Sequence, residues 1–347
     1  MKKIRLLLLI AFNIWLVAGC KKDKEEEETP VTPDTVSFYV PSGFPAPVYT
    51  FQNNPITADG FKLGRKLFYD PILSIDSTIS CGACHQQFVA FANADHRFSH
   101  GVNNLLGSRN SPGLYNLAWF PNFMWDGGVN HIEVQPIAPI TNPVEMNETI
   151  ANVVYKLQRS TTYPSLFEKA FGDDSITAQN MLRAMAQFMG AMISSGSRYD
   201  QYREGKITLT SSEMSGLNLF RSKCTGCHTE PLLTDMQFRN NGLDSVFYQD
   251  AGRGHITHLP QDSGLFRVPS LRNVALTYPY MHDGRFYSLM KVMDHYSSGI
   301  VNSTTLDSQL PVGGMGLTQQ EKTDIISFLY TLTDNSYIHD KRFSEVQ

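Results

Sequence analysis

The spacing of apolar residues along the chain favours helices joined by long irregular segments. Between Thr177 and Ser194, apolar side chains recur at helical spacing, which predicts an amphipathic helix. Thr210 and Thr318 each stand three residues before a glutamate at the start of a further amphipathic run, a pairing typical of helix N-termini. Residues 288–298 show the same helical pattern. The fold is therefore expected to be mainly α.

Two segments break this pattern because they are dense in proline and glycine. They run from Gly101 to Pro143 and from Gly252 to Gly284. Segments of this length without regular structure usually carry function in compact proteins. We expect two long loops that wrap around the groups that the protein binds.

The N-terminus has the pattern of an export signal. A basic start precedes an apolar run from Leu6 to Ala18, which is short for a membrane-spanning helix. The run ends at Gly19-Cys20 in a lipobox-like sequence, which predicts removal of residues 1–19 and a lipid on Cys20. An ordinary signal peptide or a membrane anchor is the alternative. We expect lipid anchoring on the periplasmic side of the cell envelope, with exposure at the cell surface left open.

The next segment is charged and poor in apolar residues. Residues 20–36 include a run of four glutamates and two prolines, and such a composition predicts a flexible acidic tether. The whole chain of 347 residues has a formal net charge of −4, and nothing in it resembles the basic footprint of a nucleic-acid-binding protein.

Two Cys-x-x-Cys-His pentapeptides carry the strongest chemical signal. They are Cys81-Gly-Ala-Cys84-His85 and Cys224-Thr-Gly-Cys227-His228. Such a sequence attaches haem c: both thiols bond to the porphyrin and the adjacent histidine binds the iron. The alternatives are a disulfide or a zinc site, although zinc usually takes four protein ligands and each motif offers three. With Cys20 acylated, none of the five cysteines is left for a disulfide. We predict two covalently bound haem c groups.

An internal repeat follows the two motifs. Residues 112–127 and 269–284 align without a gap and are identical at seven of sixteen positions, and each copy follows its own pentapeptide. The repeat predicts two cytochrome c-like haem domains in tandem with long loops, at residues 37–200 and 201–347.

The body of the chain resembles the bacterial dihaem cytochrome c peroxidases, a family that includes the enzyme that matures the cofactor of methylamine dehydrogenase. The similarity runs from about Phe61 to Leu332. Its specific marks are the sequences LGRKLFYDPILS, RNSPGLYN, MWDGG, NPVEM, VPSLRNV and PYMHDGRF. The resemblance implies reduction of hydrogen peroxide with electrons from a small reduced cytochrome c or cupredoxin.

The resemblance also implies roles at the N-terminal haem, whose proximal ligand is His85. Glu145 matches the family's distal glutamate, which moves a proton between the peroxide oxygens as general base and then acid. Gln135 matches the distal glutamine that orients peroxide, and Trp125 matches a tryptophan between the haems that relays electrons. Ordinary structural roles (a helix-start carboxylate, a loop hydrogen bond, core packing) are the alternatives for these three residues.

Some family members cap the N-terminal haem with a distal histidine on a loop. His100 is the better candidate here and His96 lies nearby, but a shift of two residues in the alignment puts Val102 at this position. A histidine on a surface loop is the alternative for His100. A capped iron would need reductive activation.

The C-terminal haem, with His228 as proximal ligand, is implied to be the electron-transfer centre. The peroxidases place a methionine as its sixth ligand and the cofactor-maturing relative places a tyrosine; fourteen residues after His282 stands Tyr296. Met293, one helical turn earlier, and Met281 are the alternatives. A phenolate ligand is expected to lower the reduction potential, whereas a thioether raises it.

The resemblance further implies a Ca²⁺ ion between the domains. Its ligands would be the Asn110 side chain and the backbone carbonyls of Thr277 and Pro279, oxygen donors that suit calcium. Two other functions stay open: a peroxide-driven oxidase of a partner protein, and a non-enzymatic dihaem electron carrier. Family members are often dimers, which leaves a homodimer open as well.

Overall fold

The computed structural model describes residues 36–345, so the signal, Cys20 and nearly all of the expected tether lie outside the described residues. The helices are α1 Ala58–Tyr69, α2 Cys81–Cys84, α3 Ile137–Thr141, α4 Ile150–Arg159, α5 Tyr163–Phe171, α6 Ala178–Gly190, α7 Arg198–Arg203, α8 Ser211–Lys223, α9 Gly254–Thr257, α10 Leu289–Asp294, α11 Gln319–Tyr330 and α12 Asn335–Ile338. Two short strands, β1 Phe238–Arg239 and β2 Phe266–Arg267, pair antiparallel. The described residues are thus mainly helical, as expected.

Short 3₁₀ turns and one π-helix complete the described elements. The turns are η1 Pro71–Leu73, η2 Gln87–Val89, η3 Val102–Asn104, η4 Leu117–Trp119, η5 Ile132–Val134 and η6 Pro260–Asp262, and the π-helix is η7 His295–Gly299. No helix within residues 36–345 is long and apolar enough to cross a membrane.

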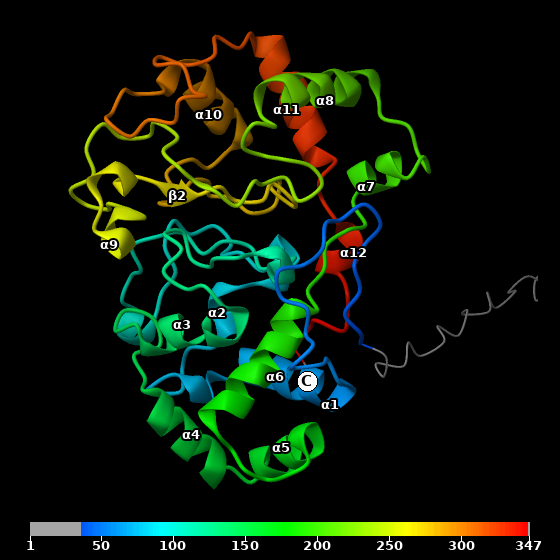
Figure 1. Ribbon diagram of the computed structural model, residues 1–347, viewed down its shortest axis with the longest axis vertical. Coiled ribbons are helices and arrows are strands. Elements are labelled where there is room, and N and C mark those ends of the chain that lie inside the picture. The colour runs from blue at the N-terminus through cyan, green and yellow to red at the C-terminus, as the bar shows by residue number, and fades with distance from the viewer. Residues whose placement is uncertain (1–35, 346–347) are drawn as a thin grey trace, which may run out of the picture. The chain divides into compact units, whose positions relative to one another are not determined.

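Two main hydrophobic cores organise the fold. The first gathers side chains from α1 and from α3 to α6, and the second gathers side chains from α8, α10 and α11. In Figure 1 the helices of the second core lie above those of the first, and loops fill the band between them. The division at residue 200 stays a prediction, but each core is built largely from its own side of that point.

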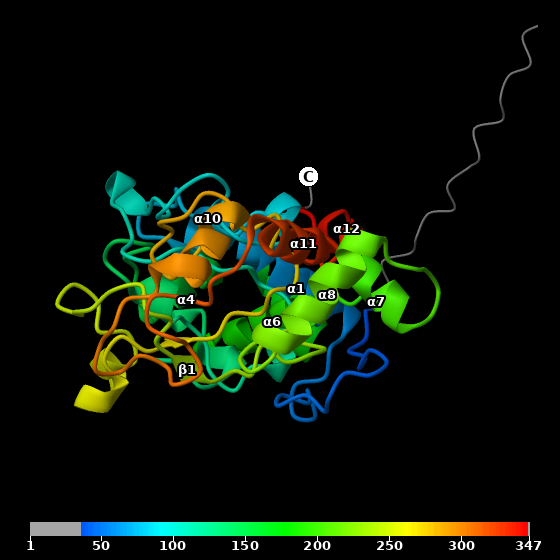
Figure 2. The same cartoon turned by 90° about the horizontal axis from the view of Figure 1, so that it is seen from above.

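The same helix crossing occurs in both cores. Helix α1 packs on α6, and α8 packs on α11, a pair that lies side by side in both views (Figures 1 and 2). At the first crossing a Cβ on Gly64 would overlap the Ala184 carbonyl, and at the second a Cβ on Gly216 would overlap that of Asp324. Glycine therefore allows the two backbones to approach closely in each half.

The repeat detected in the sequence is also present in the backbone. Asn116 and Asn273, which align across the repeat, both have a left-handed backbone, with φ of 55° and 58°. Met124 and Met281 share it as well, with φ of 66° and 76°. Isolated bridges join residues 123 to 129 in the first copy and 280 to 286 in the second. The two loops thus have a common course.

The helical predictions hold with small changes in length. Thr177 caps α6, and the capping boxes at Thr210 and Thr318 open α8 and α11. The stretch 288–298 begins as α10, but it continues as the π-helix at 295–299.

The C-terminal segment returns to the first core. Tyr337 and Phe343 are buried there, and the Tyr337 hydroxyl donates to the Leu114 carbonyl. The sequence analysis assigned all of residues 201–347 to one domain. It could not foresee this return, because apolar side chains near a chain end do not indicate which core they will join. Val36, the last residue assigned to the tether, is buried in the first core as well.

Candidate functional site

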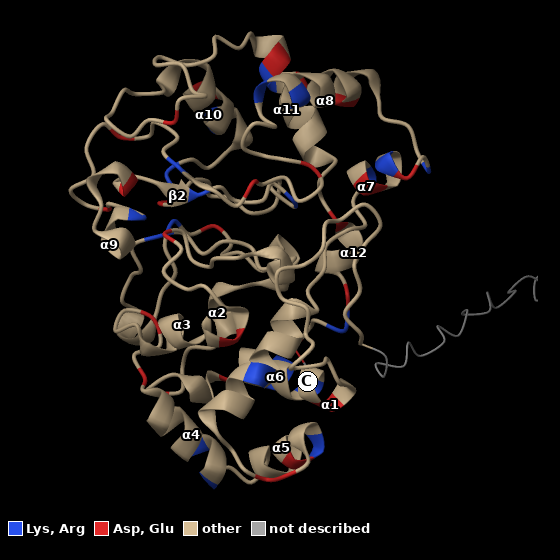
Figure 3. Ribbon diagram, in the orientation of Figure 1, with Lys and Arg blue, Asp and Glu red and all other residues tan. Residues whose placement is uncertain are grey.

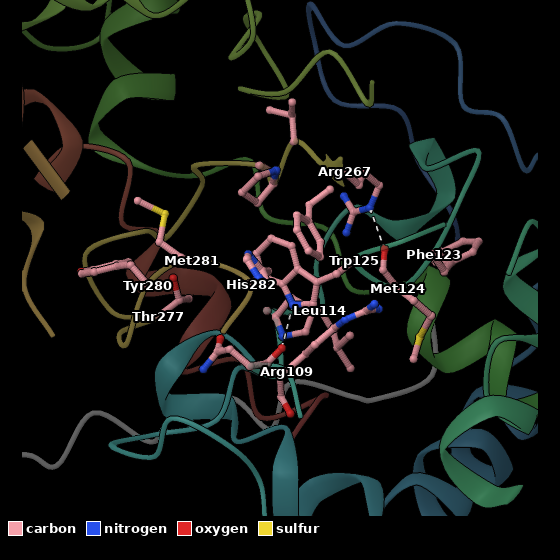
Figure 4. A pocket seen from close by; sticks show the side chains of 18 of the residues that line it. Arg109, Leu114, Phe123, Met124, Trp125, Arg267, Thr277, Tyr280, Met281 and His282 are labelled. Atoms are coloured by element: carbon pink, nitrogen blue, oxygen red, sulfur yellow. Dashed lines mark hydrogen bonds between the residues drawn. The ribbon is translucent and has the colours of Figure 1, made fainter. Parts of the chain in front are cut away.

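One cavity of about 660 Å³ is lined by residues of both halves. Its wall is mostly apolar and includes all six Cys and His residues of the two pentapeptides. The loops 101–143 and 252–284 supply much of the remaining wall, as the sequence predicted for long functional loops. Figure 4 shows part of this wall, with Trp125 and His282 side by side.

The two motif histidines are held in the same way. His85 Nδ1 lies 2.7 Å from the Phe91 carbonyl oxygen, and His228 Nδ1 lies 3.0 Å from that of Leu233. A carbonyl can only accept, so Nδ1 carries the proton in each ring. Nε2 is then the unprotonated nitrogen, which suits it to bind a metal.

The motif cysteines are available for covalent attachment. Cys81, Cys84, Cys224 and Cys227, the cysteines within the described range, are all free and line the cavity. Ser80 caps the short helix α2 and so fixes the first motif. Within residues 36–345 no three His, Cys, Asp or Glu side chains come together as a metal cluster. The residues fit haem c.

A buried arginine gives a further test of fit. Arg267 is only 7 % exposed and lines the cavity, and its Nη1 has no hydrogen-bond partner. Its Nε donates to the Met124 carbonyl oxygen at 3.3 Å (Figure 4). Burial lowers the Arg267 pKa to about 10, so the side chain remains a cation at neutral pH. A buried cation is stabilised by an anion, and a propionate of a bound haem would supply one.

The predicted distal pair lines the cavity. Glu145 is half-buried, and Asn142 Nδ2 donates to its Oε1 at 2.7 Å. Burial raises the Glu145 pKa, whereas the Asn142 hydrogen bond acts in the opposite direction. Gln135 also lines the cavity, and its Nε2 lies 3.8 Å from Met124 Sδ. The wall of the cavity that the first haem motif lines therefore also carries a carboxyl group and a side-chain amide.

Trp125 lies where the two halves meet. It is 9 % exposed, its indole N–H donates to the Asn110 carbonyl oxygen at 2.7 Å, and its own carbonyl accepts from the Arg267 amide. The His282 ring, from the second copy of the repeat, stands edge-on to it with centroids 6.5 Å apart. Trp125 therefore joins the two copies of the repeat through a ring contact, and its role between the haems stays a prediction.

The candidate sixth ligands of the second haem all line the cavity. Tyr296 lies in the π-helix, Met293 in α10 and Met281 in the preceding loop. Burial raises the Tyr296 pKa to about 12. Asn241 Nδ2 lies 3.5 Å from Met281 Sδ, and a hydrogen bond from the Asn241 side chain acts to lower the Tyr296 pKa.

His100 is the predicted site residue that lies outside the cavity wall. Its ring is exposed, its Nδ1 lies 2.6 Å from Asn104 Oδ1, and it contacts the His96 ring edge-on. The predicted calcium ligands Asn110, Thr277 and Pro279, in contrast, all line the cavity. The Asn110 amide nitrogen lies 3.4 Å from the Arg97 carbonyl oxygen.

Charged residues that sequence reasoning missed join the two halves. Arg109 binds Asp126 of the first half at 2.5 Å and Asp250 of the second at 2.7 Å, and Arg97 binds Asp283 at 2.9 Å. Charged segments gather in the band near α9 and β2 (Figure 3). Arg109 stands in the sequence RNSPGLYN, and Arg267 directly precedes VPSLRNV. Their positions in or next to sequences that carry the family resemblance were the signal that could have identified them.

Comparisons with known proteins identify the family to which the chain belongs. The di-haem cytochrome c peroxidase family model matches residues 58–208. The methylamine utilization protein MauG of Methylophilus methylotrophus is 33% identical over 315 residues, which cover 86% of this chain and 89% of that protein. The cytochrome c551 peroxidase of Nitrosomonas europaea is 32% identical and covers 80% of this chain and 81% of its own length.

Solved structures share the fold. A MauG-like protein associated with microbial copper homeostasis has a TM-score of 0.81 and 33% identity, covering 88% of this chain and 97% of that one. The diheme peroxidase BthA of Burkholderia thailandensis has a TM-score of 0.70 at 24% identity, covers 83% of this chain and 90% of that one, and supports the fold alone.

Two haem c sites that share one cavity, in a mainly helical fold of tandem cytochrome c-like domains, define a dihaem peroxidase-type oxidoreductase. The chain belongs to the di-haem cytochrome c peroxidase family. Its expected cofactors are therefore two haem c groups.

Proposed function

We propose that this protein reduces hydrogen peroxide to water at the His85 haem site. Its electrons come one at a time from a small reduced cytochrome c or cupredoxin and enter through the His228 haem site. The observation that carries the proposal is the pair Glu145 and Gln135, which line the same cavity as His85. A non-enzymatic electron carrier would have no use for a half-buried carboxyl there.

Bound haem supplies the iron and the redox chemistry, and the chain supplies proton transfer and positioning. Glu145 accepts the proton from the inner peroxide oxygen and returns it to the outer one. The Gln135 amide orients peroxide by a hydrogen bond. Trp125, which contacts His282 of the second copy of the repeat, provides the route by which electrons pass from the second half to the first.

Replacement of Glu145 tests the proposal. Glu145→Gln removes the proton acceptor while keeping the size of the side chain, so we expect kcat with peroxide to fall about 10²-fold or more. Glu168→Gln, on the exposed side of α5, is the matched control and should keep full activity. The absorbance of both haems should be unchanged in each variant. A Glu145→Gln enzyme with normal turnover would remove this residue from the mechanism.

A second candidate is a peroxide-driven oxidase of a partner protein. It is favoured by Tyr296 in the cavity wall and by the relatives named MauG. We favour Tyr296 over Met293 as the sixth ligand of the second haem. A near-infrared methionine-to-iron charge-transfer band would exclude tyrosine, and slow turnover with a long-lived oxidised state would favour the oxidase.

Three further features complete the proposal. A Ca²⁺ ion is held by Asn110, Thr277 and Pro279, and removal of this ion with a chelator should lower activity. His100 binds the iron of the first haem only in a state in which its loop adopts a different conformation, because its ring is exposed in this structure. The mature protein is anchored through Cys20 on the periplasmic side of the envelope, and a homodimer is compatible with the family.

A further inference from the structure

The cavity of about 660 Å³ that both haem motifs line is called here the haem cavity. A second cavity of about 820 Å³ adjoins it. It is called here the side cavity. Its wall includes residues of both halves and of the segment 243–250, which carries the exposed Val246 and Tyr248. The residues that line both cavities are Gly107, Ser108, Arg109, Asn241, Phe266 and His282. The side cavity therefore shares part of its wall with the haem cavity.

The charges on the wall of the side cavity are paired. Arg97 binds Asp283 at 2.9 Å, Arg285 binds Asp244 at 2.6 Å and Arg109 binds Asp250 at 2.7 Å. Each guanidinium that lines the cavity thus has a carboxylate partner that lines it too. The wall offers no unpaired arginine to attract an anion, so its chemistry favours a neutral ligand with some polar character.

Aromatic rings supply the rest of the recognition surface. Phe98, Phe247 and Tyr248 line the side cavity, and Tyr248 is 94% exposed. Phe266 and His282 form its inner wall as a stacked pair, with centroids 3.6 Å apart and an interplanar angle of 11°. Among the described residues, the His282 ring has ring contacts but no hydrogen-bond partner, which leaves it able to bind a hydroxyl group.

The stacked pair continues to the electron relay proposed above. The His282 ring contacts Trp125 edge-on at 6.5 Å between centroids, and Trp125 lines the haem cavity (Figure 4). A ligand that rests on Phe266 is therefore separated from Trp125 by two ring contacts. Electron tunnelling falls steeply with distance, so a reductant in the side cavity is well placed to donate.

We propose that the side cavity binds small neutral phenols, which serve as reductants in addition to a redox protein. This inference rests on the proposed peroxidase function. Each phenol loses one electron through the Phe266, His282 and Trp125 rings and its hydroxyl proton to water in the cavity. Two phenols thus give two phenoxyl radicals, two electrons and two protons. The two electrons, with two protons taken up from solvent beside Glu145, convert one hydrogen peroxide to two waters.

The test compares two donors in the holoenzyme. Guaiacol is the phenol and a reduced small cytochrome c is the protein donor, each with hydrogen peroxide. Val246→Trp narrows the mouth of the side cavity, and Val48→Trp, equally exposed but outside both cavities, is the control (57% and 62% exposed). For Val246→Trp we expect kcat/KM for guaiacol to fall about fivefold or more while cytochrome turnover changes less than about twofold.

A binding measurement separates this inference from the proposed function. The ferric protein should broaden the proton resonances of guaiacol, and Val246→Trp, unlike Val48→Trp, should abolish the broadening. Broadening that is equal in the wild type and in Val246→Trp, or absent from both, would overturn the inference. If the wild-type protein did not reduce peroxide with the cytochrome, the proposed function would be wrong. The broadening measurement would then still test whether the side cavity binds phenols.

Discussion

Burial and a hydrogen bond from Asn142 act in opposite directions on the acidity of Glu145, and burial is the larger effect. Burial raises the Glu145 pKa by disfavouring the carboxylate, and the Asn142 amide stabilises the carboxylate and so lowers the pKa. Catalysis by a general base needs the carboxylate, so turnover is lost as the pH falls through this pKa. Asn142→Ala removes the stabilising donor and should move the acid limb of the kcat profile to higher pH.

The size of that shift should be about one pH unit, the scale of a single hydrogen bond to a charged group. Turnover well above the pKa should be unchanged, and Thr141→Ala, at the adjacent exposed position, is the control. An acid limb that stays in place or moves to lower pH would contradict this assignment.

The charge of Arg267 leads to a prediction about haem reduction potentials, which can be tested without measuring turnover. Its unpartnered Nη1 places a buried positive charge in the cavity wall, and a positive charge favours the reduced haem. In Arg267→Gln, one haem should have a lower reduction potential by about 60 mV or more, equivalent to about 1.4 kcal/mol for one electron. Spectroelectrochemical titration measures it. Arg253→Gln, outside both cavity walls, should leave both potentials unchanged.

At the scale of elements, the crossing of α8 and α11 depends on Gly216. A Cβ there would overlap the Asp324 carbonyl oxygen and press on Phe328. Gly216→Ala should therefore lower the free energy of unfolding by about 1–3 kcal/mol, although alanine is the better helix former. Thermal unfolding of the holoprotein measures this loss. Ser215→Ala, exposed on the same helix, should be neutral or slightly stabilising; equal effects of the two changes would refute the close-packing argument.

The elements that could be predicted from the sequence are those with local signals. The capping box at Thr210 satisfies its own helix end, and the apolar periodicity of α6 reports its own buried face. The pairing of Gly64 with α6 had no such signal, because a glycine at a crossing is explained only by the partner helix. The change to a π-helix at residues 295–299 likewise depends on tertiary packing, which periodicity does not encode.

The candidate site divides in the same way at the scale of the whole molecule. The two pentapeptides predict their own chemistry because thiols and imidazole are adjacent in sequence. Trp125 and His282 could be aligned through the repeat, but their contact across the two halves could not be derived from either copy alone. The side cavity had no sequence signal, because its wall is assembled from several segments that lie far apart in the sequence.

The return of the C-terminal segment makes the stability of the two halves interdependent. Phe343 is 2% exposed and lies in the first core, where it contacts the rings of Phe61 and Phe188. Phe343→Ala should cost about 3–5 kcal/mol, as expected for the loss of a buried phenylalanine. Because its contacts are with α1 and α6, hydrogen exchange should accelerate most in those helices, which lie more than 150 residues away in sequence.

Phe328 provides the matched comparison within the same molecule. It is fully buried in the second core, where it packs on Phe220 of α8 and on Tyr199. Phe328→Ala should therefore accelerate exchange in α8 and α11 first. If Phe343→Ala loosened α8 and α11 instead, the tail would belong to the second half in solution. If each variant acts on its own core, residues 335–345 stabilise the first half, and that half is complete only when this segment packs on it.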